Sequence, residues 1–246
     1  MKNNFVLVFI LLIMINLTYA NADEFEDFED FKDEVEIKEV YDPFEAYNRV
    51  MTSFNDGLYI NVLKPMDKGY RVITTQNVRN SIGNFFNNLY FPMHFVNNVL
   101  QGKITAALTE TGRFVVNSTV GVFGIFDPAK NGLGLYPQKE DFGQTLGFYG
   151  IGAGPHIVIP FFGPSNLRDA ISLIPDAVVS PIDYQERDWW TITDQQWSYL
   201  TVKSIEEFNN VSLYSIQYDQ IRKDAVDLYP YLRDIYEQKR EDDIRK

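Results

Sequence analysis

The sequence predicts a mostly α-helical protein whose helices are joined by apolar loops rich in glycine and proline. Two observations carry this prediction. Apolar residues recur at spacings of three and four through several segments, which is the period of an amphipathic helix. From Phe142 to Leu167, 26 consecutive residues contain no charged side chain, yet six glycines and three prolines interrupt them. Strand-like alternation is confined to the short run from His156 to Phe162.

The apolar run from Phe142 to Leu167 is long enough to cross a bilayer, which needs about 20 residues in a helix. A continuous helix is nevertheless disfavoured, because glycine and proline both destabilise helix interiors. Irregular backbone in an apolar setting is tolerated where it is buried in protein or lines a wet cavity. Two readings stay open: a turn-rich segment embedded in a membrane, and a glycine-rich loop packed on a soluble core.

A secretory signal is predicted at the N-terminus. Lys2 precedes an unbroken apolar run of 11 residues from Phe5 to Ile15, and Ala20 and Ala22 follow it. A charged start, an apolar centre and small residues at a cleavage site are typical of a signal peptide, and the run is too short to span a membrane. We expect cleavage after Ala22, with Ala20 as the alternative.

An acidic leader follows the signal and holds most of the net charge. From Asp23 to Asp42 there are 11 acidic and 2 basic residues. We predict a flexible tether here, although the spacing of Phe25, Phe28 and Phe31 also fits a short amphipathic helix on a partner. The chain has no basic patch of the kind that binds nucleic acid. The predicted organisation is a signal peptide at 1–22, the leader at 23–41, a helical core at 42–180 and C-terminal helices of the same domain at 181–246.

The first helix is predicted at the start of the core. Asp42 and Pro43 fit the N-cap and first helical positions, and Glu45 fits a capping box. Helical spacing then relates a row of apolar residues: Phe44, Tyr47, Met51, Phe54 and Leu58. We expect this helix to end near Lys64-Pro65, because proline removes a backbone donor and clashes with the preceding turn.

A second helix is predicted from Gln76 to Leu89, with Val78, Ile82 and Phe86 on its apolar side. Its other side presents uncharged polar residues: Asn77, Asn80, Ser81, Asn84, Asn87 and Asn88. A solvent-facing side usually carries Lys and Glu, so this stripe suits a confined, wet surface. The alternative is that these asparagines cap, turn or hydrogen-bond to neighbouring backbone.

The remaining helices follow from the same periodicity. They are predicted at about Met93 to Leu100, at Ile104 to Thr119, after a Ser165 cap with Pro175 and Pro181 bracketing the exit, from Asp194 to about Ile221, and from near Asp227 onward. Three tryptophans, Trp189, Trp190 and Trp197, lie near the base of the long helix. Tryptophan favours membrane interfaces but also fills ordinary cores, so this cluster only supports membrane association.

The sequence contains no catalytic motif that we recognise. With no cysteine, the chain has no disulfide, thiolate metal site or cysteine nucleophile, and neither G-x-S-x-G nor H-E-x-x-H occurs. Gly150 to Gly154 resembles a phosphate loop only superficially, since Pro155 follows at once and no lysine is near. We therefore expect no enzyme activity, cofactor or metal, structural hydrogen bonds for His94 and His156, and a local ion pair between Arg168 and Asp169.

Several motifs occur in collinear order along the core. They include DPFEAYNR at 42–49, NFFNNL at 84–89, RFVVNSTVGVFGIFDPA at 113–129, EDFGQTLG at 140–147 and GPSNLRDA at 163–170, with a looser match in DLYPYLRDIYEQKR at 227–240. Through these motifs the chain resembles the MlaA (VacJ) family of the Gram-negative outer membrane. The resemblance covers nearly the whole mature body.

The resemblance implies a ring of helices embedded in the periplasmic leaflet of the outer membrane, with an amphipathic pore. It also implies removal of mislocalised phospholipid from the outer leaflet, delivery to a soluble periplasmic lipid carrier, and association with a trimeric porin. Such transport maintains the lipid asymmetry of that membrane. Family members are typically lipoproteins, whereas this chain has no cysteine to bear the lipid. An apolar belt or a porin would then hold it in place.

The lipid-path candidates are Asn77, Asn84, Asn88, Gln144, Thr145 and Arg168. The candidates for a flexible gate are Gly150, Gly152 and Gly154, although glycines needed only for tight turns would look the same. Two other classes of function stay open. The first is a soluble periplasmic scaffold protein of the cell envelope, which would bury its apolar surface and need no detergent. The second is a phospholipase-like enzyme, which would hydrolyse lipid.

Overall fold

The computed structural model describes residues 42–182 and 194–246, with side chains in the second range from residue 201 onward. The predicted signal peptide and acidic leader lie outside the described residues, as do Trp189, Trp190 and the side chain of Trp197. The mostly α fold is confirmed. Its elements are α3 (Glu45–Leu58), η1 (Tyr59–Leu63), α4 (Lys64–Ile73), α5 (Gln76–Leu89), α6 (Phe91–Leu100), α7 (Ile104–Thr119), α8 (Pro128–Leu133), α9 (Phe142–Phe148), β1 (His156–Ile159), β2 (Gly163–Asn166), α10 (Leu167–Val179), α11 (Asp194–Asp224) and α12 (Leu228–Arg245).

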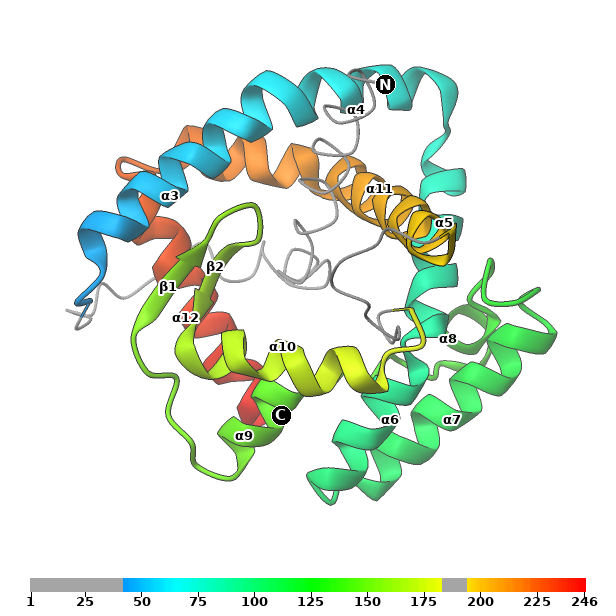
Figure 1. Cartoon of the computed structure of the whole chain (residues 1–246). Helices are drawn as coiled ribbons and strands as arrows, with labels where there is room; N and C mark the ends of the chain where they lie inside the picture. Colours follow the sequence, from blue (N-terminus) through cyan, green and yellow to red (C-terminus); the bar gives the residue numbers. More distant parts are fainter. Residues whose placement is uncertain (1–41, 183–193) are drawn as a thin grey trace.

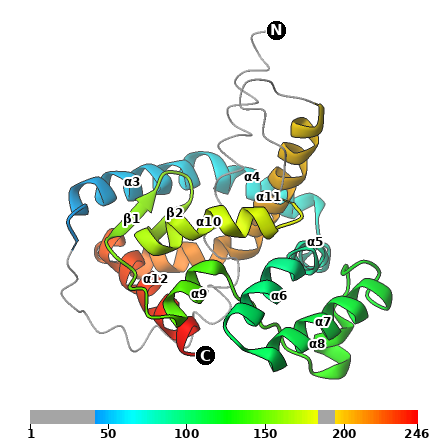
Figure 2. The ribbon, with the colours of Figure 1, turned by 60° about the horizontal axis from the view of Figure 1, so that its bottom comes forward.

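The described helices are arranged in a ring (Figure 1). One side is formed by α3, η1 and α4 and the next by α5 and α6, and α10 runs from the β1–β2 hairpin towards α6. α12 contacts α9, β2 and α3, while α11 packs against α4 and α5, so the two C-terminal helices join opposite parts of the ring. α7 and α8 contact each other and lie beyond α6 at one edge of the molecule (Figures 1 and 2).

Several predicted helix boundaries are confirmed. α5 and α7 have the predicted bounds, and α11 begins at Asp194 as expected. Thr75 caps α5 by accepting the N–H of Val78 at 3.4 Å, and Asp227 caps α12 by accepting the N–H of Tyr229 at 3.3 Å. In these segments the periodicity and the capping residue point to the same boundary, so local signals suffice.

The predicted start of the first helix is wrong by a few residues. Asp42 does not cap an α-helix at Pro43; α3 begins at Glu45, after Phe44. The Asp42 carboxylate accepts the N–H of Phe44 and the side-chain amide of Asn48, each at 3.1 Å. It also accepts the hydroxyl hydrogen of Tyr229 from α12. A tertiary contact therefore uses the carboxylate that the local pattern assigned to a cap.

The predicted stop at Lys64-Pro65 is also wrong. α3 continues through the π-helical turn η1 directly into α4, which ends at Ile73. The N–H of Lys64 bonds to the carbonyl of Tyr59, the wide spacing of a π-helix. Pro65 then occupies the first turn of α4, directly after this wide turn. The wide turn lets the chain pass a proline without ending the helical segment.

The cap of α10 differs from the prediction, whereas the helix ends between Pro175 and Pro181 as predicted. Asn166, not Ser165, caps it by accepting the N–H of Asp169 at 2.9 Å. Pro175 lies inside the helix, four residues before its last residue, Val179. Proline there removes one backbone donor. The helix continues because the next residue, Asp176, is held by hydrogen bonds from Phe142 and Asn97 on two other elements.

The uncharged run from Phe142 to Leu167 is not a single helix, as its glycines and prolines predicted. It forms α9, an exposed loop, and a hairpin in which His156 opposes Asn166 and Ile159 opposes Gly163. The run from His156 to Phe162 thus supplies β1 and most of the hairpin turn. Within the two described ranges, every helix is too short or too polar to cross a membrane.

Candidate functional site

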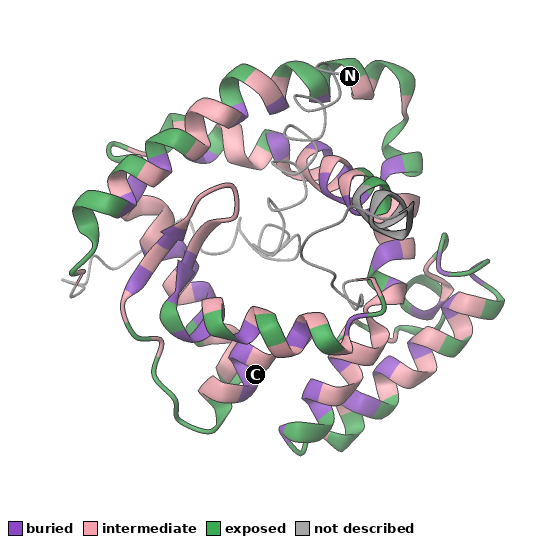
Figure 3. Cartoon of the chain, viewed as in Figure 1, coloured by how far each residue is buried: buried purple, intermediate pink, exposed green. Residues whose placement is uncertain are grey.

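Polar and apolar residues are distributed through this ring in the reverse of the usual pattern. Among the described residues, buried polar and charged side chains far outnumber buried apolar ones, and many large apolar side chains are exposed. Figure 3 shows buried and exposed positions alternating along the helices of the ring. Charged residues are seldom buried unless paired, and a wide exposed apolar surface marks a binding or membrane surface.

α10 shows the inversion most clearly. Its buried positions, here called the inner face, are Arg168, Asp169, Ser172 and Asp176. Its exposed positions, here called the outer stripe, are Leu167, Ile171, Ile174 and Val178. These four recur at helical spacing, and Ile174 is 70% exposed whereas Asp176 is 4% exposed. The helix is amphipathic with its polar side turned into the protein.

Other helices repeat this arrangement. α7 buries Glu110, Arg113 and Asn117 and exposes Ile104, Leu108 and Val115. α3 buries Asn48 and Thr52 and exposes Tyr47, Val50 and Phe54. The interior of the ring is consequently held by polar contacts, and much of its outer surface is apolar.

A cleft of about 460 Å³ lies between two parts of the ring. Its walls come from α6, α8 and the loop at 136–141 on one side, and from α9, the hairpin, α10 and α12 on the other. The volume is typical of a site for a small molecule or part of a larger one. Carboxylates and basic side chains line it together with apolar side chains, so its surface is a mixture of ionic and apolar groups.

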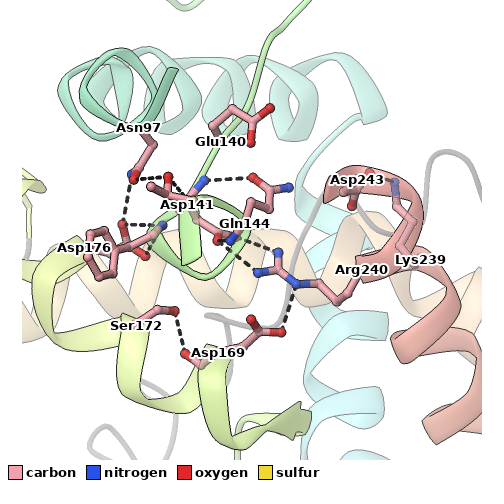
Figure 4. Close-up of polar contacts among 12 residues, drawn as sticks. Asn97, Glu140, Asp141, Gln144, Asp169, Ser172, Asp176, Lys239, Arg240 and Asp243 are labelled. Carbon is pink, nitrogen blue, oxygen red and sulfur yellow. Dashed lines mark hydrogen bonds and ion pairs between the residues drawn. The ribbon is translucent and has the colours of Figure 1, made fainter. Parts of the chain in front are cut away.

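Arg240 of α12 joins three helices at the wall of this cleft (Figure 4). Its guanidinium forms two hydrogen bonds to the Asp141 carboxylate, at 2.6 and 2.9 Å, and one to Asp169 at 3.0 Å. Arg168 binds the other oxygen of Asp169 at 2.8 Å, which confirms the predicted local ion pair. Although burial opposes it, the charges of Arg240 and Arg168 lower the pKa of the Asp169 carboxyl to about 2.

Asp176 also lines this cleft, and the pKa of its carboxyl is shifted in the opposite direction to that of Asp169. Its carboxylate accepts the N–H of Phe142 at 3.1 Å and the amide of Asn97 at 3.2 Å, which ties α10 to α9 and α6. Burial and the neighbouring Asp141 raise the pKa of the Asp176 carboxyl to about 7. Asn97 is fixed in turn by the hydroxyl of Thr145 at 2.8 Å.

A smaller cavity of about 90 Å³ adjoins the cleft. Asn84, Asn87 and Asn88 of α5 line it, opposite the ion pair in which Arg113 binds Asp127 at 3.0 Å. Both cavities share four lining residues: His94, Lys130, Pro137 and Lys139. The asparagine stripe and the main cleft are therefore parts of neighbouring cavities.

The structure brings three of the six lipid-path candidates to these cavities. Asn84 and Asn88 line the smaller one, and Gln144 lines the cleft. Asn88 also donates to the hydroxyl of Ser118 at 2.9 Å, and Asn84 to the carbonyl of Ile125 at 3.4 Å, so both also make the local bonds of the alternative reading. Gln144 completes the capping box of α9.

The other three candidates lie elsewhere. Thr145 and Arg168 are buried behind the cleft wall and are not among its lining residues. Asn77 is exposed near the start of α5. The gate candidates Gly150, Gly152 and Gly154 lie in the exposed loop between α9 and β1 and line neither cavity. Gly150 and Gly154 have positive φ values of 84° and 72°, as tight turns require.

Sequence reasoning missed the residues that organise the site. Arg240 and Asp141 are 99 positions apart, and no local pattern relates them. Lys130 and Lys139, which line both cavities, match none of the sequence patterns. Both histidines are hydrogen-bonded as predicted: Nδ1 of His94 lies 3.1 Å from the carbonyl of Glu140, and Nδ1 of His156 lies 2.7 Å from Glu237. No group of three metal-ligating side chains occurs among the described residues.

The fold and the site together define a class: a helical ring with many exposed apolar side chains, a polar interior and a cleft lined in part by ionic side chains. The chain belongs to the MlaA lipoprotein family, whose family model matches residues 40–243. This match confirms the resemblance seen in the sequence motifs.

Relatives and a solved structure agree with this assignment. The chain is 32% identical over 209 residues to an uncharacterised protein of Rickettsia bellii, covering 85% of this chain and 78% of that protein. It is 30% identical over 203 residues to the intermembrane phospholipid transport system lipoprotein MlaA of Escherichia coli, covering 80% and 76%. A solved structure from work on the structural basis for maintenance of bacterial outer membrane lipid asymmetry matches with a TM-score of 0.68 and 27% identity, covering 83% of this chain and all of the other.

Proposed function

We propose that this protein transports phospholipid between membranes and thereby maintains the lipid asymmetry of the outer membrane. In this proposal it takes mislocalised phospholipid from the outer leaflet through an amphipathic pore and passes it to a periplasmic lipid carrier. The observation that carries the proposal is the inverted ring, which exposes apolar stripes, buries polar side chains and has a cleft lined in part by ionic side chains. Family membership and the name of the Escherichia coli relative support the same function.

The outer stripes suit a ring that lies in the periplasmic leaflet of the outer membrane. Exposed apolar residues on α3, α7 and α10 would contact acyl chains, with which they mix without cost. Helices that are too short or too polar to span a bilayer fit within one leaflet instead, as amphipathic interfacial helices do. The sequence has no cysteine to carry a lipid anchor, so in this proposal the outer stripes and a trimeric porin partner retain the protein.

The polar interior gives a lipid head group a wet route past the apolar layer. A charged group at the centre of a bilayer costs at least about 2.5 to 3.5 kcal/mol on insertion scales. The cleft and its smaller neighbour replace the lost water with amides, carboxylates and basic side chains. No covalent bond is made or broken, so the protein acts by lowering this barrier and not as an enzyme.

The second candidate is a soluble periplasmic scaffold protein of the cell envelope. It would keep its apolar residues inside, as water-soluble proteins do. The exposure of Ile171 and Ile174, 56% and 70%, favours the transporter instead. A protein released from the membrane by salt, with no need for detergent, would support the scaffold.

The test is the amount of phospholipid in the outer leaflet of cells that lack the gene. Accumulation that a plasmid copy of the intact protein reverses is the expected result. A matched plasmid carries the double substitution Ile171→Asp and Ile174→Asp, which should fail to reverse it. No accumulation on deletion would contradict the transport function.

A further inference from the structure

The connection between α7 and α8 exposes only apolar side chains. Residues 120–126, here called the α7–α8 loop, consist of valine, glycine, phenylalanine and isoleucine alone. The exposed members are Val120, Val122, Phe123, Ile125 and Phe126, and Phe123 is 73% exposed. α7 and α8 lie at one edge of the molecule (Figures 1 and 2). The proposed function assigns membrane contact to stripes on α3, α7 and α10 and gives this loop no role.

Two residues of the loop have strained backbone conformations. Val122 and Phe123 have positive φ values of 54° and 57°. Glycine adopts this left-handed region readily, whereas a β-branched or bulky residue there is an outlier. Such strain persists where the surrounding structure imposes it, and it often marks a functional position. Glycine would fit both positions with less strain, so folding alone does not explain the two apolar side chains.

The loop is fixed by its own backbone and by close packing. Its N–H groups donate to carbonyls between positions 116 and 122 at 2.8 to 3.2 Å, and the donors are Val120, Gly121, Phe123, Gly124, Ile125 and Phe126. A Cβ at Gly121 would lie 2.5 Å from the carbonyl oxygen of Asn117, and one at Gly124 would lie 2.5 Å from Cβ of Asn88. The loop therefore presents its apolar side chains from a fixed backbone.

These hydrogen bonds indicate what covers the loop. In the hydrocarbon of a bilayer no water is present to bind an open N–H, so backbone donors must be satisfied within the chain. A segment that pairs with a partner protein through its backbone leaves such donors open for that partner. The internal bonding of the α7–α8 loop therefore suits contact with acyl chains.

The charges around the loop favour the same partner. From Phe114 to Phe126 the chain has no charged side chain. The residues that flank this run, Arg113 and Asp127, bind each other at 3.0 Å, and their side chains are only 10% and 12% exposed. Protein interfaces usually surround an apolar centre with a polar rim. An uncharged run between two mutually neutralised residues matches an uncharged medium better.

We propose that the α7–α8 loop inserts between the acyl chains of a lipid bilayer and anchors this edge of the ring. Phe123 and Phe126 contribute most, because they are the largest of its exposed side chains. The inference rests on the membrane location in the proposed function and adds a specific anchor to it. This anchor would need no lipid-bearing cysteine, which the chain lacks.

Single-cysteine labelling tests the position of the loop. Because the chain has no cysteine, a polarity-sensitive dye attaches only where one is introduced. The full chain carries Phe123→Cys, Ile174→Cys or Val226→Cys, and Val226 is a fully exposed control outside the stripes. Each labelled protein is reconstituted into vesicles of phosphatidylethanolamine and phosphatidylglycerol. The quenchers are aqueous iodide and lipids with a nitroxide near the end of the acyl chain.

We expect the acyl-chain nitroxide, and not iodide, to quench the dye at position 123, and iodide to quench the dye at position 226. If iodide quenches position 123 while position 174 is protected, the loop inference is wrong and the membrane location of the ring stands. If iodide quenches both positions, the proposed membrane location fails as well. Protection of position 123 only after outer-membrane proteins are added would assign the loop to a protein partner and overturn the lipid assignment.

Vesicle binding measures how much the loop contributes. Phe123→Asp with Phe126→Asp should bind at least about tenfold more weakly than the wild type, because two large apolar side chains are replaced by charges. Aspartate tolerates the left-handed conformation, so we expect an unchanged circular dichroism spectrum. The matched control, Phe123→Leu with Phe126→Leu, stays apolar and should bind within about threefold of the wild type. Equal binding by the folded aspartate variant and the wild type would overturn the anchor.

Discussion

The two sides of α10 differ in what they do for the protein. The inner face contributes Asp169 and Asp176, which bind Arg240, Asn97 and the start of α9. The outer stripe has no such partners and exposes its isoleucines. In a water-soluble helix the apolar side would be packed and the polar side solvated. Here polar contacts of the inner face stabilise the fold, whereas the apolar side is exposed and can contact the surroundings of the ring.

This contrast separates stability from location. Changes on the inner face should destabilise the fold, because removal of one partner of a buried ion pair leaves the other charge buried without a partner. Changes on the outer stripe should leave the fold intact and alter only what the protein associates with. The following experiments test that separation, from the largest expected loss of stability to the smallest.

Removal of Arg240 should have the largest effect. Arg240→Ala removes the ion pair of Arg240 with the buried Asp169 and its ion pair with Asp141. Breaking a buried pair in this way typically costs about 3 to 5 kcal/mol. The measurement is urea unfolding in detergent followed by circular dichroism. The control is Arg245→Ala, whose partner Glu241 is exposed, and which should change stability by less than about 1 kcal/mol. Equal losses for the two variants would mean that the Arg240 contacts do not stabilise the ring.

A methyl group at Gly143 should disturb the same contacts by crowding. A Cβ there would collide with the Asp169 carboxylate and the Arg240 guanidinium. Overpacking of this kind costs about 1 to 3 kcal/mol, so Gly143→Ala should lower the unfolding midpoint. Gly152→Ala is the control, because a Cβ at that position meets no atom within 4 Å. An unchanged midpoint for Gly143→Ala would show that the network can move aside.

Titration of Asp176 should make stability depend on pH. Burial and Asp141 raise the pKa of its carboxyl from 3.8 to about 7 in the folded protein. The contribution of this protonated group is therefore fully present below pH 3.8 and is lost as pH rises towards 7. Asp176→Asn should flatten the fall in stability between pH 5 and pH 7, a slope of at most about 1.4 kcal/mol per pH unit.

Thermal unfolding across this pH range measures the slope for the wild type and the Asp176 variant. Asp169 titrates with the opposite sign, since its lowered pKa means that its contribution is lost only as pH falls towards 2. Asp242→Asn, a change near the exposed C-terminal end of α12, serves as the matched control and should keep the wild-type slope. The same slope in the Asp176 variant would mean that another group titrates.

Charges on the outer stripe should have the smallest effect on stability and a large effect on location. Ile171→Asp with Ile174→Asp places carboxylates at exposed positions, where substitutions usually change stability by about 0.5 kcal/mol or less. We expect a normal circular dichroism spectrum and loss of the protein from the membrane fraction. The control, Ile171→Val with Ile174→Val, stays apolar and should remain in the membrane. Retention of the aspartate variant would place membrane contact elsewhere on the ring.

Much of the helical framework could be predicted from local patterns. The bounds of α5 and α7, the start of α11 and the Asp227 cap of α12 all follow from periodicity and capping, which depend on residues a few positions apart. Prediction failed at Asp42 and at Lys64-Pro65, where a contact from a distant element and a π-helical turn, respectively, changed the local outcome. For the site, the sequence pointed to Asn84, Asn88 and Gln144 but gave no signal for Arg240 or Lys130.

The sequence by itself determined the class of fold, the breaking up of the uncharged run, and the family. Each of these depends on the order and spacing of neighbouring residues. Only the tertiary structure decided which side of each helix faces inward, because the period of an amphipathic helix is the same whether its polar side is buried or exposed. It also decided which charges meet: Asp141 and Asp169 meet Arg240 only when α12 returns to α9 and α10. Lys130 and Lys139 likewise line the same two cavities only because the ring brings α8 and the loop before α9 together.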